Sequence, residues 1–211
     1  KKDQTYDLFI QRIEYCTKTY KENFQTNPNG LPTQPETAPW QVLEGAFTII
    51  SAMGPEVLTA QNSSETKFDA QNYLGEHVVS IICYYSSAIN SLPSPWLIVG
   101  ALKVLTLFGK LIPADLHLKR LETLITYVNQ DETLMASYSA YCLTKFIGTG
   151  GIISNIESIG RQLVTVLLNA LQLHYENQYI LSAVIVVIGS SPKQILPIAE
   201  TVTTFVFTQL E

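Results

Sequence analysis

The sequence predicts an all-α fold in which antiparallel pairs of helices stack side by side. Three observations lead to this prediction. Apolar residues recur three and four positions apart in most segments, Pro and Gly separate these segments, and one short pattern returns at intervals of roughly forty residues. The chain has 211 residues, of which 46% are hydrophobic and only 15% are charged, so it has ample apolar surface for a folded core.

The first two predicted helices lie on either side of a proline-rich segment. The helix expected over 3–25 carries an apolar stripe of Phe9, Ile13, Cys16, Tyr20 and Phe24. Residues 27–39 contain four prolines and one glycine and are predicted to form a loop. The next helix, over 40–53, repeats the spacing with Leu43, Ala46, Phe47 and Ile50, and Gly54-Pro55 ends it.

The middle of the chain contains the longest stretch without a charge, Val78 to Leu102. Ser and Pro cluster at its centre, so two apolar helices over 72–91 and 95–110 explain it better than one membrane-spanning helix. Ser94-Pro95 is typical of an N-cap followed by Pro at the first helical position. No membrane insertion is therefore expected.

The second half predicts five more helices, over 114–129, 131–147, 155–174, 176–190 and 192–210. In the first of them the apolar stripe contains Leu121 and Leu124, and Lys119, Arg120 and Glu122 are assigned to the opposite, polar side. Two segments rich in β-branched residues, 184–188 and 201–207, could be strands on propensity. A continued helical stripe favours helices there, and Ser191-Pro192 is predicted to cap the last one.

A pattern of Ala followed eight residues later by Gly occurs three times, and a fourth copy lacks the Gly. The alanines are Ala46, Ala101, Ala140 and Ala183, separated by 55, 39 and 43 residues. A small residue allows the neighbouring helix to approach closely, and the Gly ends the helix so that the chain can reverse. Helix pairs with this period are typical of HEAT and armadillo repeats, so the predicted fold is a HEAT/armadillo-like superhelix.

The first spacing exceeds the second by 16 residues, which predicts an insertion at about 54–72. This segment is polar and has no helical periodicity. It is either a contact surface for a partner or a solvated loop, and because lengthening a loop costs little free energy, both alternatives stay open.

The chain lacks the residue patterns of common catalytic and cofactor sites. Its 13 basic and 18 acidic residues give a net charge of −5, which argues against binding nucleic acid. No phosphate-binding loop, dinucleotide fingerprint, zinc motif or nucleophile elbow is present. We therefore expect no enzyme activity, no cofactor and no metal. The three cysteines are far apart, which favours buried reduced thiols over disulfides.

Several short motifs resemble one family of helical-repeat proteins. They are Val99-Gly100-Ala101-Leu102-Lys103-Val104-Leu105, the segment 110–116, Ser137-Tyr138-Ser139-Ala140-Tyr141 with the following 142–146, and Glu176-Asn177-Gln178-Tyr179-Ile180-Leu181. Their order and separations over about 40–211 resemble the karyopherin-β nuclear transport receptors, and within them the importin-α re-exporters, the cellular apoptosis susceptibility family.

This resemblance implies a binding function. Members of the family carry importin-α out of the nucleus together with GTP-bound Ran, so Ran-GTP and importin-α are the expected partners and nucleus and cytoplasm the expected compartments. The family's inserted segment contacts Ran, which implies contact residues at Glu56, Gln61, Glu65, Lys67 and Asp69. The alternatives are a HEAT scaffold or regulatory subunit outside nuclear transport, or another importin-β-type receptor.

The expected organisation is a single solenoid fragment of a longer protein, over 1–211. It comprises a trailing helix at 1–25 and repeats at 40–91, 95–129, 131–174 and 176–211. Stacked repeats bury their faces only against neighbours, and terminal repeats carry polar caps. The last predicted helix still carries Val202, Phe205, Val206 and Leu210. Self-association through exposed end helices is therefore expected.

Overall fold

In a computed structural model of the chain, the described residues are 2–26, 39–59, 69–87, 94–111, 117–148 and 153–210. Nearly all of these residues are helical, and none of them lies in a strand. The all-α prediction is therefore confirmed for this part of the chain. Contacts divide the chain into two compact units, Lys1–Pro113 and Ala114–Glu211.

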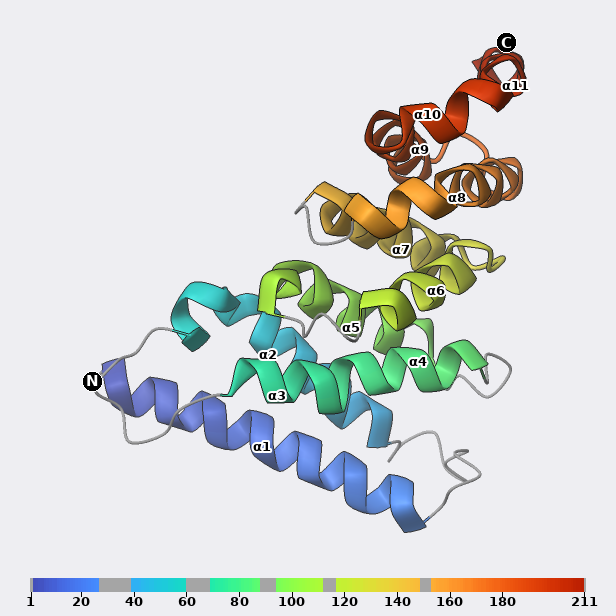
Figure 1. Cartoon of the computed structure of the whole chain (residues 1–211). Coiled ribbons are helices and arrows are strands. Elements are labelled where there is room, and N and C mark those ends of the chain that lie inside the picture. Colours follow the sequence, from blue (N-terminus) through green and yellow to red (C-terminus); the bar gives the residue numbers. More distant parts are fainter. Residues whose placement is uncertain are drawn as a thin grey trace. The chain divides into compact units, whose positions relative to one another are not determined.

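The first unit contains α1, α2 and α5 lying side by side, with a further helical segment packed against α5 (Figure 1). Its elements are α1 (Lys2–Thr26), α2 (Pro39–Thr59), α3 (Ala70–Tyr73), a π turn (Leu74–Val79), α4 (Ser80–Ser87), α5 (Pro95–Leu107) and a short 3-10 turn (Gly109–Leu111). The amphipathic stripes explain the packing, because Ile13 of α1, Phe47 of α2 and Leu102 of α5 are fully buried.

The helix boundaries of the first unit follow the predicted stop and start signals. Gly54 has a positive φ of 72°, which breaks α2 before a last helical stretch to Thr59. The Ser94 hydroxyl accepts a hydrogen bond from the Trp96 amide at 3.3 Å, and Pro95 opens α5, so the predicted cap is confirmed. The uncharged stretch 78–102 contains two helices, because α4 ends at Ser87 before α5 begins.

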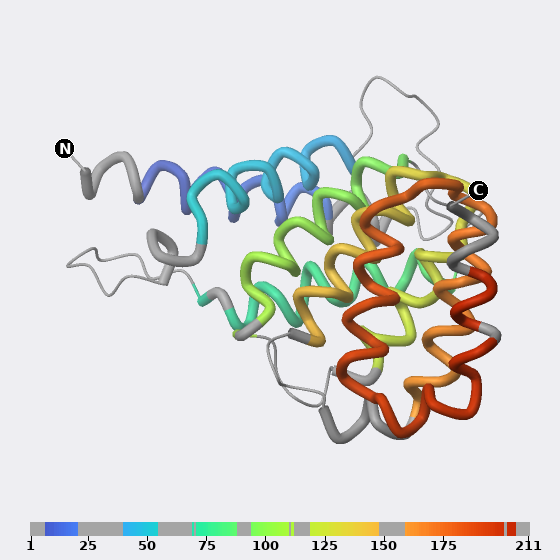
Figure 2. The backbone as a smooth tube through the Cα atoms, turned by 90° about the horizontal axis from the view of Figure 1, so that it is seen from above, coloured from blue at the N-terminus to red at the C-terminus, as the bar shows by residue number. Residues whose placement is uncertain are grey.

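The second unit also consists of helices arranged in two layers. Its elements are α6 (His117–Val128), α7 (Thr133–Gly148), α8 (Ile153–Leu173), α9 (Gln178–Ser190), α10 (Pro192–Ile195), a 3-10 turn (Leu196–Ile198) and α11 (Ala199–Leu210). The most extensive packing is between α7 and α9. Helix α8 packs against α9 and α10, and α6 packs against α7 (Figure 2).

Two predictions about the last helices are wrong in detail, and one is confirmed. The segments 184–188 and 201–207 are helical, as the stripe predicted. The single helix expected over 192–210 is interrupted by the 3-10 turn containing Pro197, because proline donates no amide hydrogen bond and clashes with the preceding turn. Ser191 precedes Pro192 as expected, but its hydroxyl donates back to the Val187 carbonyl at 2.8 Å and caps nothing.

All four alanines of the repeated pattern are fully buried, on α2, α5, α7 and α9. The glycines eight residues later lie at Gly54, in the turn after α5 at Gly109, and at the end of α7 at Gly148. The burial of each alanine agrees with the predicted helix packing, and the predicted position of each glycine near a helix end is confirmed. Cys16, Cys83 and Cys142 are free and buried, as expected.

Candidate protein-binding surfaces

Of the five predicted contact residues, only Asp69 has a described side chain. Glu56 lies on the last stretch of α2, with its side chain outside the described part, and Gln61, Glu65 and Lys67 also fall outside it. Asp69 is exposed, and its carboxylate accepts a hydrogen bond from the Asn72 amide at 3.0 Å. Asp69 therefore caps the start of α3, a structural role that the sequence analysis did not assign to it.

A shallow hollow of about 340 Å³ lies beside this cap. It is lined by Asp69, Gln71, Asn72, Gly75 and Glu76. The hollow therefore places one predicted contact residue on an open surface together with amide and carboxylate groups. Such groups are suited to hydrogen bonds with a partner's backbone or basic side chains.

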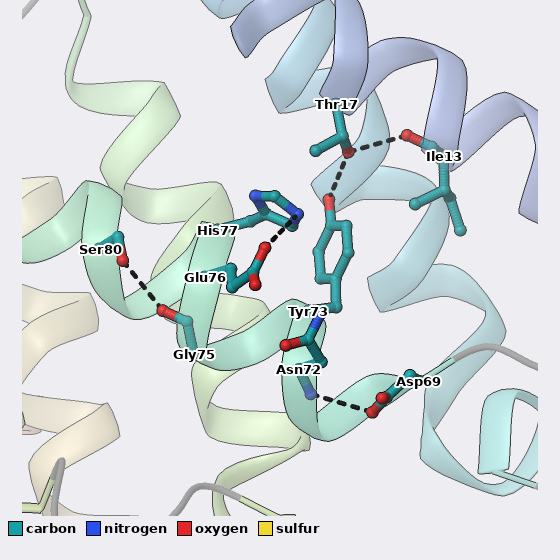
Figure 3. A network of polar contacts seen from close by, with 9 residues as sticks. All are labelled: Ile13, Thr17, Asp69, Asn72, Tyr73, Gly75, Glu76, His77 and Ser80. Atoms are coloured by element: carbon teal, nitrogen blue, oxygen red, sulfur yellow. Dashed lines mark hydrogen bonds and ion pairs between the residues drawn. The ribbon is translucent and has the colours of Figure 1, made fainter.

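The helix that follows the cap contains the π turn, and a polar contact joins its first residues to α1. The Tyr73 hydroxyl lies 3.1 Å from the hydroxyl of Thr17, which itself donates to the Ile13 carbonyl at 2.8 Å (Figure 3). Since Thr17 has a single hydroxyl hydrogen, Tyr73 is the donor in the first contact. Burial raises the pKa of the Tyr73 phenol above its ordinary value.

The π turn carries His77 and Glu76 next to this contact. The His77 ring packs edge-on against the Tyr73 ring with centroids 4.8 Å apart, and the Glu76 carboxylate lies 4.0 Å from His77 Nε2 (Figure 3). The Ser80 hydroxyl donates to the Gly75 carbonyl five residues earlier, at 3.0 Å. The sequence contained no signal for a π turn, because its apolar spacing from Leu74 onward suits an ordinary helix.

Two further tyrosines pack against each other near α1. A side-chain hydrogen bond joins Tyr20 to Tyr85, and Tyr84 packs edge-on against Tyr85 with centroids 5.0 Å apart. Burial is the main cause that raises the pKa of both Tyr20 and Tyr85. Tyr20 and Tyr85 are therefore core groups, whereas Tyr84 lies at the surface.

A second hollow, of about 320 Å³, lies between α2 and α5, and we call it the α2–α5 hollow. It is lined by Glu44, Phe47, Thr48, Ser51, Ala52, Trp96, Val99, Gly100 and Lys103. Trp96 at its edge is 56% exposed, whereas Phe47 and Val99 form a buried floor. A Cβ atom at Gly100 would lie 3.4 Å from the Phe47 side chain, so this glycine allows α2 and α5 to approach closely.

The sequence analysis missed the α2–α5 hollow, although a signal for it was present. Pro-Trp pairs precede both helices, at Pro39-Trp40 and Pro95-Trp96. They mark equivalent helix starts, but only the packing reveals that Trp96 stays exposed while Trp40 is half-buried. An exposed tryptophan beside a hollow is typical of a protein-binding surface, because Trp is enriched among the residues that dominate binding energy.

Arg120 of α6 corrects a second prediction. It was assigned to the polar side of its helix, yet only 1% of it is exposed. Its guanidinium carbon lies 3.2 Å from the centroid of the Phe146 ring. Burial lowers the Arg120 pKa to about 10. Arg120 therefore belongs to the core of its unit and is not available as a contact residue.

The surface of α7 and α9 carries an aromatic pair. The rings of Tyr141 and Tyr179 meet edge-on with centroids 5.9 Å apart, and the Lys145 ammonium lies 5.4 Å from the Tyr141 ring. On α11, Val202 is buried and Phe205 is half-buried, while the side chains of Val206 and Leu210 lie outside the described part. The predicted self-association through this helix therefore stays a prediction.

Neither metal-binding groups nor a single spanning helix occur in the described residues. No three His, Cys, Asp or Glu side chains there lie close enough to hold a metal ion. No single described helix is long and apolar enough to cross a membrane. Gln178–Ser190 and Pro192–Ile198 reach that length only as a pair, bent by 104°.

Comparison with known proteins adds no identification. No family model, no curated protein and no solved structure matches the chain.

Proposed function

We propose that this chain is part of a HEAT-type solenoid that binds other proteins, and specifically of a karyopherin-β receptor that binds Ran-GTP and importin-α in nucleus and cytoplasm. The α2–α5 hollow with the exposed Trp96 is the observation that carries the binding function. It combines a rigid, buried floor with a large aromatic residue at its edge, which is the arrangement that binding hot spots favour.

Contacts spaced by one repeat support the solenoid part of the proposal. His174 contacts Thr133 and Gln130, which precede it by 41 and 44 residues, and Asn177 contacts Ser137, which precedes it by 40. In a solenoid each repeat contacts its neighbours, so polar contacts recur at the repeat length. The four buried alanines support the same period.

The resemblance supports the choice of partners; three of its motifs fall on described helices, and most of the fourth, 110–116, lies outside the described residues. The motif 99–105 lies on α5, the motif 137–146 on α7, and the motif 176–181 spans the turn into α9. Asp69 belongs to the predicted contact segment and lines the first hollow. These placements are compatible with partner contacts at the segment 60–68.

The test is binding of the chain to GTP-loaded Ran and to importin-α, with GDP-loaded Ran as the control. Three forms are compared: the unchanged chain, a chain with residues 60–68 replaced by a Gly/Ser linker, and Trp96→Ala. The linker variant keeps Asp69, because this residue caps α3. The proposal expects GTP-dependent binding that the linker weakens, with little change in melting temperature. Equal binding to both nucleotide forms, or none, contradicts the transport function.

A HEAT scaffold outside nuclear transport is the second candidate, and one observation favours it. The α2–α5 hollow lies on the first helices of two predicted pairs, away from the inserted segment that the resemblance implies as the contact with Ran. This scaffold function would be supported if the chain does not bind Ran and if Trp96→Ala weakens its binding to a different protein.

A further inference from the structure

The geometry points to a register switch in the helix that spans Ala70 to Ser87. We infer that the π turn Leu74–Val79 is held by the contact between Tyr73 and Thr17. When that contact is released, the turn becomes an ordinary α-helix and rotates residues 69–73 about the helix axis relative to α4. This inference does not depend on the proposed partners.

The burial of Tyr73 requires the π turn. Leu74, Val78, Ile82 and Tyr85 are all buried and follow one another at spacings of four, four and three, which a regular α-helix also places on one face. Tyr73 precedes Val78 by five residues, and residues five apart on an α-helix point roughly 140° apart. The wider π turn brings Tyr73 to the buried face, where 8% of it remains exposed.

Tyr73 is also the single buried side chain among those described in residues 69–73. Asp69, Gln71 and Asn72 are exposed. The buried Tyr73 ring, its edge-on contact with the His77 ring and its hydroxyl contact with Thr17 at 3.1 Å oppose the return to regular helical hydrogen bonds. A π turn is the rarer and less favourable helix form, so the balance depends on that single side chain.

The turn itself is built to change register at low cost. Gly75 lies inside it, and the absence of a Cβ lets the backbone adjust without a steric clash. The Ser80 hydroxyl now reaches the Gly75 carbonyl five residues back. In an α-helix the same hydroxyl reaches the carbonyl four residues back, that of Glu76, so the serine keeps a partner in both forms.

The switch would rebuild the surface hollow beside it. Asp69, Gln71 and Asn72 precede the turn, while Gly75 and Glu76 lie within it, and all five line the hollow. The π turn contains one residue more than the α-helical turn that would replace it. The change to an α-helix therefore rotates Asp69, Gln71 and Asn72 by about 100° about the helix axis relative to α4. The hollow is therefore present when the segment forms the π turn, and its lining residues separate when the segment forms a regular α-helix.

The first test removes the hydroxyl contact without removing the ring. Amide hydrogen exchange is measured for the whole chain in Tyr73→Phe and in the matched variant Tyr85→Phe, which alters a buried phenol on α4, beyond the turn. The inference expects exchange of residues 74–80 to slow at least tenfold in Tyr73→Phe, because the turn becomes a regular α-helix, and to stay unchanged in Tyr85→Phe. Unchanged exchange in Tyr73→Phe would overturn it.

The second test deletes the extra residue. Removing Gly75 shortens the turn so that a regular helix brings Tyr73 to the buried face, whereas removing Gly45 from the regular helix α2 misaligns its buried stripe. The inference expects the Gly75 deletion to keep or raise the melting temperature and to slow exchange over 74–80, while the Gly45 deletion lowers the melting temperature. If both deletions destabilise the chain equally, the inference is wrong.

Discussion

Nε2 of His174 lies 2.7 Å from the carbonyl oxygen of Gln130, which is 44 residues earlier in the chain. A carbonyl only accepts, so Nε2 carries the hydrogen, and Nδ1 faces the Thr133 hydroxyl at 3.2 Å. The buried ring thereby links the end of α8 to the connection between α6 and α7. Asn177, three residues further on, both caps α9 and donates to the Ser137 hydroxyl at 2.8 Å.

Replacing His174 by Ala should lower the free energy of unfolding by about 1–3 kcal/mol, because the buried imidazole is lost together with its contacts to the Gln130 carbonyl and the Thr133 hydroxyl. Gln172→Ala on the exposed side of α8 is the matched control and should stay within about 0.5 kcal/mol. Urea unfolding with unchanged slope measures both. A His174→Ala variant as stable as the control would show that the contact contributes nothing.

Gly160→Ala should destabilise the chain by about 1–3 kcal/mol through overpacking. A Cβ atom at position 160 would overlap the Ser191 side chain, lying 2.6 Å from its Cβ, and a change of rotamer cannot move that atom. Gly189→Ala on α9 meets nothing within 4 Å and should stabilise by about 0.5–1 kcal/mol through helix propensity. Thermal unfolding of both variants distinguishes the two cases, and a shift of the same sign in both would contradict the close contact.

Arg120→Lys should cost about 1–2 kcal/mol, although the charge is kept. The planar guanidinium lies over the Phe146 ring, whereas a lysine ammonium is more strongly hydrated and resists burial. Lys119→Arg, the reverse exchange at the exposed neighbouring position, is the control and should change nothing measurable. Equal stability of the two variants would mean that the stacking geometry is unimportant.

Alkaline pH should destabilise the first unit, because it contains three tyrosines whose phenols are buried. The phenols of Tyr20, Tyr73 and Tyr85 have pKa values raised above the ordinary 10.0. Above pH 10 the unfolded chain releases these protons while the folded chain keeps them, so the free energy of unfolding falls as the pH rises. Urea unfolding between pH 9 and about 11.5 measures this slope.

The control for the alkaline experiment is a variant with Tyr20→Phe and Tyr73→Phe, which removes two of these phenols and should flatten the slope. Arg120 acts in the opposite direction. Its pKa of about 10 lies below the ordinary 12.5, so the folded chain loses that proton first and this group raises the free energy of unfolding as the pH rises further. A stability that does not fall above pH 10 would contradict the burial of the three phenols.

The amino-acid sequence by itself determined the helices and most of their ends. Apolar spacing is a local property, and it predicted the burial of Ala46, Ala101, Ala140 and Ala183 as well as helices in the β-branched segments. Caps and breaks such as Ser94 and Gly54 also depend on a few neighbouring residues, because the groups that they satisfy belong to the same turn.

Only the tertiary structure decided which polar side chains are buried and where the helices depart from regularity. Arg120 shares the face of Leu124 and Tyr127, but its charge predicted an exposed side chain. The structure instead buries it against the Phe146 ring. At the start of the π turn, the Tyr73 hydroxyl contacts the hydroxyl of Thr17, which lies 56 residues earlier in the chain. Such contacts join residues that are distant along the chain, so no periodicity or local propensity contains them, and the packing of neighbouring helices fixes them.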